Sequence, residues 1–370
     1  MKHIKIIDTT LREGEQAAYV YFTLEQKLKI VELLTQLNID EIELGVCVEN
    51  PDIKDLINIS RKIASAKLSL WSRLVRQDIE TALSLSPDIV SISIPVSELH
   101  IYKKLHKTPR QLLELAEKEI SWLRENTDIY ISVGFEDATR ANKDFLLTIS
   151  KLLEDCGINR IRIADTLGIL DPITTYSLIK ELRENVRVDL GIHTHNDFGM
   201  ATANAISAFI AGVNYIDVTA CGLGERAGNA ALEEVVSFLS KKFNITKYNL
   251  KILKKLCHFV AEVACYPISP KKPIVGEEIF TCESGIHIDG LLKSTDTYEP
   301  FSPEELGLSR KFLIGKKAGK RAVEAKLKEL GIHVDNYNLE FVFKKVKEIS
   351  TNLNRCLTDE EIKNIATTAY

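Results

Sequence analysis

The stretch DLGIHTHNDFGMATANAISAFIAG, Asp189–Gly212, contains two hydrophobic patterns in succession. Its beginning, DLGIHTH, is a short run typical of a strand. From Met200 onward the apolar residues recur three and four positions apart, the period of an amphipathic helix, and Gly212 stands where such a helix is expected to end. The run YIDVTA follows and predicts another strand. The stretch is therefore one strand–helix unit joined to the strand of the next.

The same unit recurs through the first two thirds of the chain. Strands are expected at residues 4–8, 41–46, 68–74, 88–96, 129–135, 160–165, 189–195 and 215–220. Helical patterns separate or follow them, such as those at residues 24–37, 51–64, 109–123, 143–157, 200–212 and 231–243. These make eight strand–helix units, the number that closes a parallel barrel with its helices outside.

A doubly wound open sheet is the alternative to a barrel. It would place a glycine fingerprint after the first strand, where this chain has TTLREGEQ. We therefore predict an α/β fold, a (β/α)8 TIM barrel followed by a smaller α-rich C-terminal region. Since the pattern changes near Asn249, we expect the barrel over residues 1–249, a helical linker over 250–275 and C-terminal subdomains over 276–370.

The composition excludes several classes of protein. The chain has 370 residues, 45% of them hydrophobic and 27% charged, which is enough to bury a substantial core. A net charge of -4 provides no basic surface for nucleic acid. The apolar runs are too short to span a membrane, and the start lacks the apolar region of a signal peptide. The 7 cysteines form no CxxC pair. We expect a soluble cytoplasmic protein.

Polar residues follow the expected strands. In a TIM barrel the carboxyl ends of the strands carry the active site, so these side chains are expected to meet there. They are Arg12, Glu13, Gln16, Arg73, Ser97, His100, Glu136, Asp137, Asp165, Thr166, His193, His195, Asn196, Asp197, Glu225, Arg226 and Asn229.

The pair His193 and His195 is the most informative element of this set. Residues two apart on a strand point to the same side, so both imidazoles are expected to face inward. Two histidines and a carboxylate are a common ligand set for a divalent metal. Glu13 can supply the carboxylate, since the first strand of a closed barrel neighbours the last, and Asn229 can add an amide oxygen. The alternative is that both histidines are hydrogen-bonded core residues.

Three other stretches allow two interpretations each. DTTLREGEQ, Asp8–Gln16, is either a solvated strand end or part of a site. GLGERAGN is either a glycine-rich turn or a phosphate cradle, and it lacks the signature of a P-loop. Lys316 and Lys317 form either a solvated basic face or a phosphate contact.

Several motifs together resemble the homocitrate synthase and 2-isopropylmalate synthase family, within the DRE-TIM metallolyase superfamily. They are DTTLREGEQ, EDATR, ADTLG, HTHNDFGMATANA, GLGERAGNAALEEV, ESGIHIDGLLK and TYEPF. The resemblance extends to about Val323. Without a long C-terminal regulatory domain, the chain resembles the short homocitrate synthases that serve nitrogenase cofactor synthesis.

The resemblance implies an acyltransferase that condenses acetyl-CoA with a 2-oxo acid and then hydrolyses the thioester. The substrate it favours is 2-oxoglutarate, which gives homocitrate and CoA. It also implies one divalent metal ion, Mg²⁺, Mn²⁺ or Zn²⁺. The implied metal ligands are Glu13, His193, His195 and, more weakly, Asn229.

The resemblance also implies roles for other residues. Arg12 would stabilise the oxyanion and Glu136 would act in catalysis, while the expected substrate-binding residues are Gln16, Arg73, His100 and Thr166. His287 and Tyr298 resemble residues that a capping subdomain brings to the site of a partner copy, which implies a domain-swapped homodimer. Their role would be enolisation or hydrolysis, and the alternative is that they only pack at an interface.

The chain departs from the family pattern at several positions. Cys282 stands where a histidine is common, GKKAGK at Gly315–Lys320 where GKHSGR is common, and Gly134-Phe135 where serines are common. The arginine that meets the distal carboxylate of 2-oxoglutarate after the fourth strand is absent, and His100 is the nearest polar candidate.

Three alternatives follow from these departures. The same chemistry with another 2-oxo acid would give 2-isopropylmalate, citramalate or citrate of the Re type, and a dicarboxylic acid would need a cation near Arg73, Arg76 or His100. A retro-aldol acyl-CoA lyase would need a catalytic cysteine loop, which Cys221 fits poorly. A non-catalytic metal-binding protein is the third.

Overall fold

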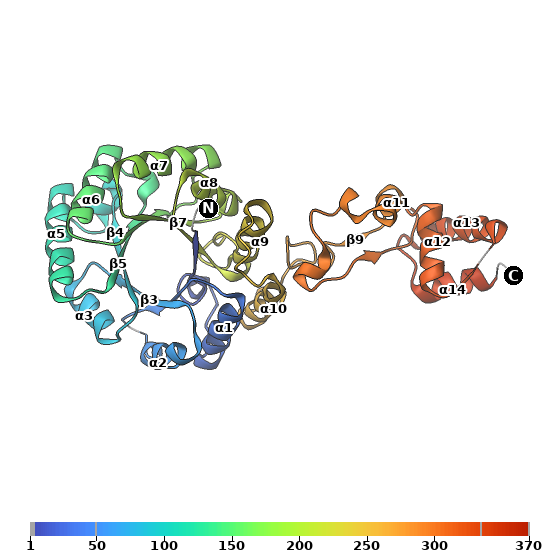
Figure 1. The fold of residues 1–370 in the computed structure, drawn as a ribbon, viewed down its shortest axis with the longest axis horizontal. Helices are drawn as coiled ribbons and strands as arrows, with labels where there is room; N and C mark the ends of the chain where they lie inside the picture. Colours follow the sequence, from blue (N-terminus) through green and yellow to red (C-terminus); the bar gives the residue numbers. More distant parts are fainter. Residues whose placement is uncertain (1–3, 49, 334, 369–370) are drawn as a thin grey trace. The chain divides into compact units, whose positions relative to one another are not determined.

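The computed structural model describes residues 4–48, 50–333 and 335–368. The chain divides into two compact units, Met1–Ile268 and Ser269–Tyr370. In the first unit eight parallel strands form a closed barrel, and Figure 1 shows its helices arranged around the outside. The structure therefore confirms the predicted TIM barrel.

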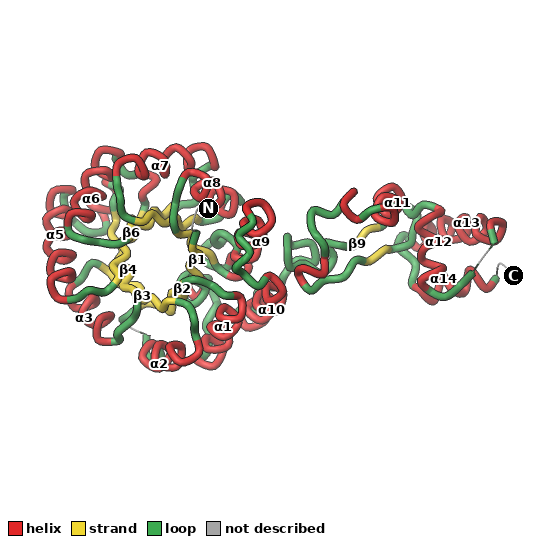
Figure 2. The backbone as a smooth tube through the Cα atoms, viewed as in Figure 1, coloured by secondary structure: helices red, strands yellow, loops and turns green. Residues whose placement is uncertain are grey.

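The strands run in sequence order around the barrel, and Figure 2 shows them as a yellow ring. Pairing of β1 with β8, from Lys5 opposite Tyr215 to Asp8 opposite Val218, closes the ring. The eight strands are β1 (Lys5–Asp8), β2 (Glu41–Val46), β3 (Lys67–Arg73), β4 (Ile89–Pro95), β5 (Tyr130–Glu136), β6 (Arg160–Asp165), β7 (Asp189–Thr194) and β8 (Tyr215–Val218).

The helices of the first unit cover the barrel. They are α1 (Leu24–Leu37), α2 (Ile53–Ile63), α3 (Arg76–Ser84), α4 (Glu98–Lys103), α5 (Pro109–Asn126), α6 (Lys143–Asp155), α7 (Pro172–Asn185), α8 (Ala201–Ala211), α9 (Leu232–Phe243) and α10 (Leu253–Val263). Local sequence determines several of their ends. A capping box between Thr23 and Gln26 begins α1, and Asn38 ends it in the left-handed conformation at a φ of 66°.

The described end of β7 differs from the prediction by one residue. β7 ends at Thr194, and His195 instead forms an antiparallel bridge with Asn229. The loop after β8 folds back over the end of β7, so His195 is held by this loop rather than by a neighbouring barrel strand.

The barrel interior contains charged side chains in addition to apolar ones. Arg160 is fully buried, and its guanidinium donates to both oxygens of Glu41 at 2.7 and 2.9 Å and to Ser132 Oγ at 2.9 Å. It also lies 4.3 Å from the centre of the Tyr215 ring. The ion pair and the hydrogen bond to Ser132 join β2, β5 and β6 across the barrel, and the contact with the Tyr215 ring adds β8.

The second unit has its own hydrophobic core. It contains two short parallel strands, β9 (Thr281–Cys282) and β10 (Lys311–Phe312), and the helices α11 (Gly285–Lys293), α12 (Lys320–Glu329), α13 (Asn336–Leu353) and α14 (Asp359–Thr367). Buried side chains from these helices pack together, among them Ile288, Val323, Val342 and Ile362. Within the described ranges of both units, no helix has the length and apolar character needed to cross a membrane.

Replacing Glu41 by alanine is expected to lower the free energy of unfolding by about 3–5 kcal/mol, because Arg160 would stay buried without its counter-charge. Urea denaturation followed by circular dichroism measures the change. Glu114→Ala is the matched control, since the Arg110–Glu114 pair is solvent-exposed and its loss should change stability far less. Equal losses in the two variants would contradict a structural role for the buried pair.

Candidate active site

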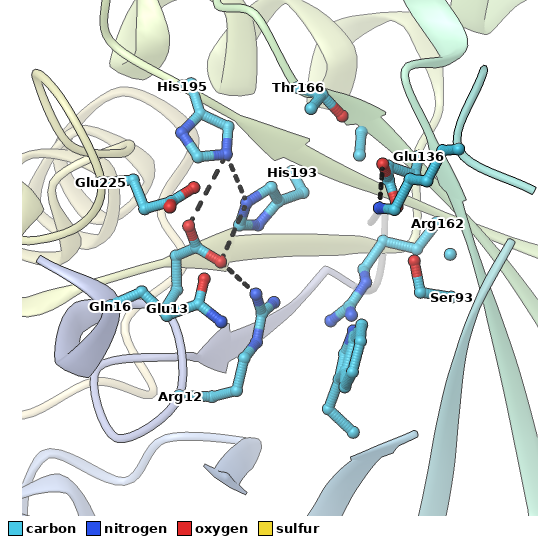
Figure 3. Close-up of a pocket in the computed structure, with 14 residues that line it drawn as sticks. Arg12, Glu13, Gln16, Ser93, Glu136, Arg162, Thr166, His193, His195 and Glu225 are labelled. Carbon is cyan, nitrogen blue, oxygen red and sulfur yellow. Dashed lines mark hydrogen bonds and ion pairs between the residues drawn. The ribbon is translucent and has the colours of Figure 1, made fainter. Parts of the chain in front are cut away.

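A pocket of about 240 Å³ opens at the carboxyl ends of the barrel strands. Figure 3 shows Glu13, His193, His195 and Arg12 on one side of it and Glu136 on the other. The lining residues are Arg12, Glu13, Gln16, Trp71, Ser93, Lys104, Gly134, Glu136, Arg162, Ala164, Thr166, His193, His195 and Glu225.

Glu13, His193 and His195 form a buried triad whose ligand atoms all lie within 4.8 Å of one another. The Nε2 atoms of the two histidines are 3.3 Å apart. The carboxylate of Glu13 lies 3.9 Å from His193 Nε2 and 3.7 Å from His195 Nε2. Two imidazole nitrogens and a carboxylate converging in this way are a set that binds divalent metal ions.

A second set of side chains orients the triad. His193 Nδ1 lies 3.0 Å from Asp217 Oδ2, which directs Nε2 of the same ring toward Glu13 and His195. A carboxylate behind a metal-binding histidine selects its tautomer in this way and leaves the other nitrogen with a free lone pair.

Asn229 lies beside the triad with its amide already oriented. Its Nδ2 donates to the Leu223 carbonyl at 3.1 Å, and its buried Oδ1 has no hydrogen-bond partner among the described residues. An unpartnered buried carbonyl oxygen is costly unless water or a cation satisfies it. The donors present therefore fit a divalent cation, with Asn229 Oδ1 as a further oxygen.

Glu43 connects the two arginines of the pocket. It is fully buried and accepts from Arg12 Nε at 2.6 Å and from Arg162 at 3.0 Å. Burial alone would raise the pKa of Glu43, but the charges of Arg12 and Arg162 outweigh it and hold this pKa at about 2. Arg162 also lies 3.0 Å from Asp217, so a continuous chain of buried charges runs from Arg12 to His193.

Two members of the triad, Glu13 and His195, are in their metal-binding protonation states near neutral pH. Burial raises the pKa of Glu13, but Arg12, His193 and His195 lower it by more. The pKa is therefore below its usual value, and this carboxyl is ionised. Burial, followed by the proximity of His193, lowers the pKa of His195 to about 3, so its imidazole is neutral. Ionised carboxylate and neutral imidazole are the forms that bind metal.

On the opposite side of the pocket, Lys104 holds the carboxylate of Glu136, and His100 lies close to it. Lys104 Nζ donates to both of its oxygens, at 2.7 and 2.9 Å, and His100 Nδ1 lies 2.8 Å from Oε1. Thr166 lines the pocket nearby, and its hydroxyl oxygen accepts from the backbone N–H of Asp137 at 2.7 Å.

Of the ten barrel residues that were expected to bind metal or substrate or to act in catalysis, seven line the pocket: Arg12, Glu13, Gln16, Glu136, Thr166, His193 and His195. The other three lie outside the lining: Asn229 next to the triad, His100 beside Glu136, and Arg73. Arg73 instead donates to Asp78 at 2.5 and 3.2 Å. Arg76 donates to Glu119 at 2.7 Å and lies over the Trp122 ring. This geometry therefore offers no support for Arg73 or Arg76 as a substrate contact.

His287 and Tyr298 belong to the second unit, where they contact each other. Their ring centroids are 4.3 Å apart. Gly290, one turn after His287, makes this packing possible, because a Cβ there would lie 2.5 Å from Tyr298 Cε2. Both side chains are largely exposed within this unit.

Six lining residues were not among those expected at the site: Trp71, Ser93, Lys104, Gly134, Arg162 and Ala164. Arg162 had a detectable signal, because RIRIAD places two arginines on the same side of a strand, as HTH does with its histidines. No pattern in the sequence indicates Lys104, because it follows α4 in a loop whose path depends on the folded chain.

The glycine-rich loop after β8 positions Asn229. Gly222 and Gly228 have φ values of +71° and +90°, and a Cβ on Gly228 would come within 2.0 Å of the Gly222 carbonyl oxygen. This tight turn brings Asn229 back to bridge His195. Of the two lysines considered for phosphate contact, Lys317 pairs with Glu283 at 3.1 Å.

Family comparisons cover both units. A model described as HMGL-like matches residues 3–260, and one described as homocitrate synthase post-HMGL domain-like matches residues 274–354. Among solved structures, the HMG-CoA lyase of Bacillus subtilis superposes with a TM-score of 0.65 over 72% of this chain and 96% of that one. At 20% identity that likeness shows the fold alone.

Three curated synthases are similar over nearly the whole chain. 2-Isopropylmalate synthase 2 of Caldanaerobacter subterraneus subsp. tengcongensis is 39% identical over 98% of this chain and 94% of its own length. Homocitrate synthase 1 of Nostoc sp. is 39% identical over 99% of this chain and 97% of its own length. The (R)-citramalate synthase of Methanocaldococcus jannaschii is 37% identical over 97% of this chain and 73% of its own length. Their identities are too similar to select one product.

Glu13→Ala and His195→Ala are each expected to abolish tight binding of Mn²⁺ or Zn²⁺, because each removes a ligand from a set of three. Isothermal titration of metal-free protein measures this. Glu136→Ala, which removes a carboxylate from the opposite side of the same pocket, is the control and should retain metal binding. Undiminished affinity in either triad variant would contradict the assignment of the metal centre.

Metal-free protein is expected to lose stability as the pH falls from 6.5 toward 3. Over that range the unfolded chain binds a proton at His195 that the folded chain excludes, since the pKa of His195 is lowered from 6.5 to about 3. Unfolding free energies measured at several pH values should fall less steeply in His195→Asn. The same substitution at exposed His106 should leave the slope unchanged, and equal slopes in all three proteins would refute the prediction.

Proposed function

Since the chain belongs to the HMGL-like family, among the homocitrate, 2-isopropylmalate and citramalate synthases, we propose that it is an acyltransferase that condenses acetyl-CoA with a 2-oxo acid. The proposed substrate is 2-oxoglutarate, and the proposed products are homocitrate and CoA. The reaction joins the methyl carbon of acetyl-CoA to the keto carbon and then hydrolyses the thioester.

The observation that carries this proposal is the position of Arg12 next to the triad. The guanidinium of Arg12 contacts Glu13 and donates to Glu43, so it is fixed on two sides. Burial opposes its charge, but Glu43 and Glu13 raise the pKa of Arg12, so it remains a permanent cation. An oxo acid held at the triad would place its carbonyl oxygen near both a metal site and this cation.

A divalent ion bound by Glu13, His193 and His195 would supply a Lewis acid for the keto group. The role of Arg12 is to stabilise the negative charge that develops on the keto oxygen during carbon–carbon bond formation. A preorganised donor of this kind contributes about 10²–10³ in rate. Because Glu43 holds Arg12 through a buried contact, and Arg162 in turn holds Glu43, the orientation of Arg12 requires little reorganisation during the reaction.

The remaining polar groups are assigned by their place in the pocket. Gln16 and Thr166 are proposed to bind the oxo acid, and Glu136 is proposed to act in catalysis on the opposite side. His287 and Tyr298 are proposed to serve enolisation or hydrolysis. The proposed role of His287 and Tyr298 rests on the resemblance to the family, and so does the proposal of a domain-swapped homodimer.

A retro-aldol lyase reaction is a weaker proposal than condensation. Its cysteine would have to reach the pocket, whereas Cys221 is buried and its Sγ donates to the Cys257 carbonyl at 3.4 Å. Cys221 is also absent from the lining residues of the described pocket. Condensation with a 2-oxo acid other than 2-oxoglutarate is the closer alternative.

Metal-loaded protein is expected to release CoA from acetyl-CoA in the presence of 2-oxoglutarate, and Arg12→Lys to lower kcat by about 10²–10³. The shorter ammonium cannot make both contacts of the guanidinium. A thiol-release assay with 2-oxoglutarate, oxaloacetate, 2-oxoisovalerate and pyruvate measures turnover.

Arg73→Lys is the matched control for Arg12→Lys, and it should keep nearly full activity because Arg73 lies outside the pocket lining. Metal affinity should be unchanged in both variants. No CoA release with any of the four acids would refute the condensation. Release with one of the others but not with 2-oxoglutarate would replace homocitrate by the corresponding product.

A further inference from the structure

We propose that Cys221, Glu233 and Cys257 form a second metal centre, which takes a thiophilic divalent cation such as Zn²⁺. All three lie outside the lining of the active-site pocket, so the inference does not depend on the proposed condensation. The role of this centre is structural, because its ligands join the turn after β8 to the helices α9 and α10.

The first argument is the convergence of three ligand atoms. The two Sγ atoms and a carboxylate oxygen of Glu233 all lie within 4.8 Å of one another. Cys257 Sγ lies 3.5 Å from Glu233 Oε2. Around a tetrahedral zinc ion, the usual bond lengths place a sulfur and an oxygen ligand roughly 3.6 Å apart. The spacing of the cluster therefore suits a zinc ion with only small movements of its side chains.

The second argument is the chemistry of the donors. Cysteine sulfur and carboxylate oxygen are both ligands of zinc, and sulfur favours zinc over magnesium or manganese. The Cys257 carbonyl oxygen lies 3.4 Å from Cys221 Sγ, so it or a water molecule can supply the fourth ligand. The triad of the pocket offers only nitrogen and oxygen donors. Sulfur ligation therefore distinguishes the second centre from the first.

The third argument is that the fold holds each ligand in place. Cys221 belongs to the turn Ala220–Gly222 and has a φ of 60°. This left-handed conformation is costly for a residue with a Cβ and persists only where the surroundings hold it. Glu233 lies on α9 and Cys257 on α10, and both are fully buried. A preformed set of this kind loses little conformational entropy when an ion binds.

The fourth argument is the electrostatic setting. A zinc ion with two thiolates and one carboxylate leaves an excess of negative charge, which a buried site must stabilise. Glu233 is the second residue of α9, so the centre lies at the N-terminal end of that helix, where the helix dipole favours negative charge. The backbone N–H of Cys221 also donates to Glu233 Oε2 at 3.0 Å. Both interactions stabilise the excess charge.

The second centre is connected to the triad through the glycine-rich loop after β8. Next to Cys221, the carbonyl of Gly222 accepts from the backbone N–H of Asn229 at 2.9 Å, and Asn229 bridges His195. An ion at Cys221 therefore fixes the start of the loop that brings Asn229 to the triad.

Burial of the three ligands determines when the ion enters. Because their exposed fractions are 5% or less, we expect the ion to bind as the chain folds, when its ligands are still accessible. Titration of metal into folded protein then reports the triad alone, and the second centre has to be loaded by refolding.

Cobalt tests the assignment, because thiolate ligands give Co²⁺ a near-ultraviolet charge-transfer band that nitrogen and oxygen ligands do not give. Reduced protein is unfolded with a chelator and, after the chelator is removed, refolded with Co²⁺ in the absence of oxygen. The wild type should show the band and hold one cobalt ion more per chain than Cys257→Ser, in which the band should be lost. Glu13→Ala should keep the band, since it changes only the triad.

Cys47→Ser is the matched control for Cys257→Ser. Cys47 is also buried, and its Sγ donates to the Asp78 carbonyl at 3.3 Å, outside the cluster. This variant should keep both the band and the cobalt content of the wild type. Circular dichroism of each variant checks that it has refolded.

Glu233→Gln tests the centre with a smaller change, because its amide oxygen can still accept from the Cys221 N–H. We expect its affinity for Zn²⁺ to fall about 100-fold, since a neutral amide is a weaker ligand than a carboxylate. Competition with a chromophoric chelator after refolding, in the Glu13→Ala background, measures this affinity without the triad.

A thermal measurement completes the test. Zn²⁺ present during refolding should raise the unfolding midpoint of Glu13→Ala but not that of the double variant with Cys257→Ser, because a bound ion stabilises the folded chain. A refolded wild type without the charge-transfer band would overturn the inference, and so would an equal band in Cys257→Ser. If Cys257→Ser does not fold, an unchanged Zn²⁺ affinity in Glu233→Gln would overturn it.

Discussion

The buried carboxylate of Glu43 is the group on which the arrangement of the pocket depends. It accepts from Arg12 and Arg162, which come from the loop after β1 and from β6. Arg162 also pairs with Asp217 on β8, and Asp217 orients His193 on β7. Because isolated charges in a barrel interior are costly, each of these groups requires the next to be in place. The network therefore fixes Arg12, His193 and the barrel strands in one arrangement.

The triad of Glu13, His193 and His195 depends on barrel closure in the same way. Glu13 and His193 are 180 positions apart by their residue numbers, and only the pairing of β1 with β8, next to β7, brings them within 3.9 Å. Tight turns in the loop after β8 then bring Asn229 to His195. A site assembled from strand ends in this way places polar groups in the pocket while apolar and paired charged residues stabilise the barrel below.

Most of the triad side of the pocket could be predicted from the sequence, and most of the opposite side could not. Alternation along HTH predicts that His193 and His195 face inward, and closure of an eight-stranded barrel predicts that Glu13 is nearby. Arg73, by contrast, was expected to bind the substrate because it stands at the end of a predicted strand. In the structure its guanidinium donates to Asp78 on α3 instead. Lys104 lines the pocket because α4 directs its loop inward, and no periodicity in the sequence reports that path.

The sequence by itself determined the barrel, its strand order and the inward-facing pair His193 and His195, because hydrophobic period and strand alternation act over a few neighbouring residues. Only the tertiary structure decided which charges neutralise one another. Arg162 and Glu43 are 119 positions apart, and their pairing depends on the opposite sides of the barrel being brought together. The same holds for Lys104 and Glu136, whose contact forms only when the loop after α4 lies over the end of β5. Charge pairing at such separations is set by the distance between folded elements, which local sequence does not contain.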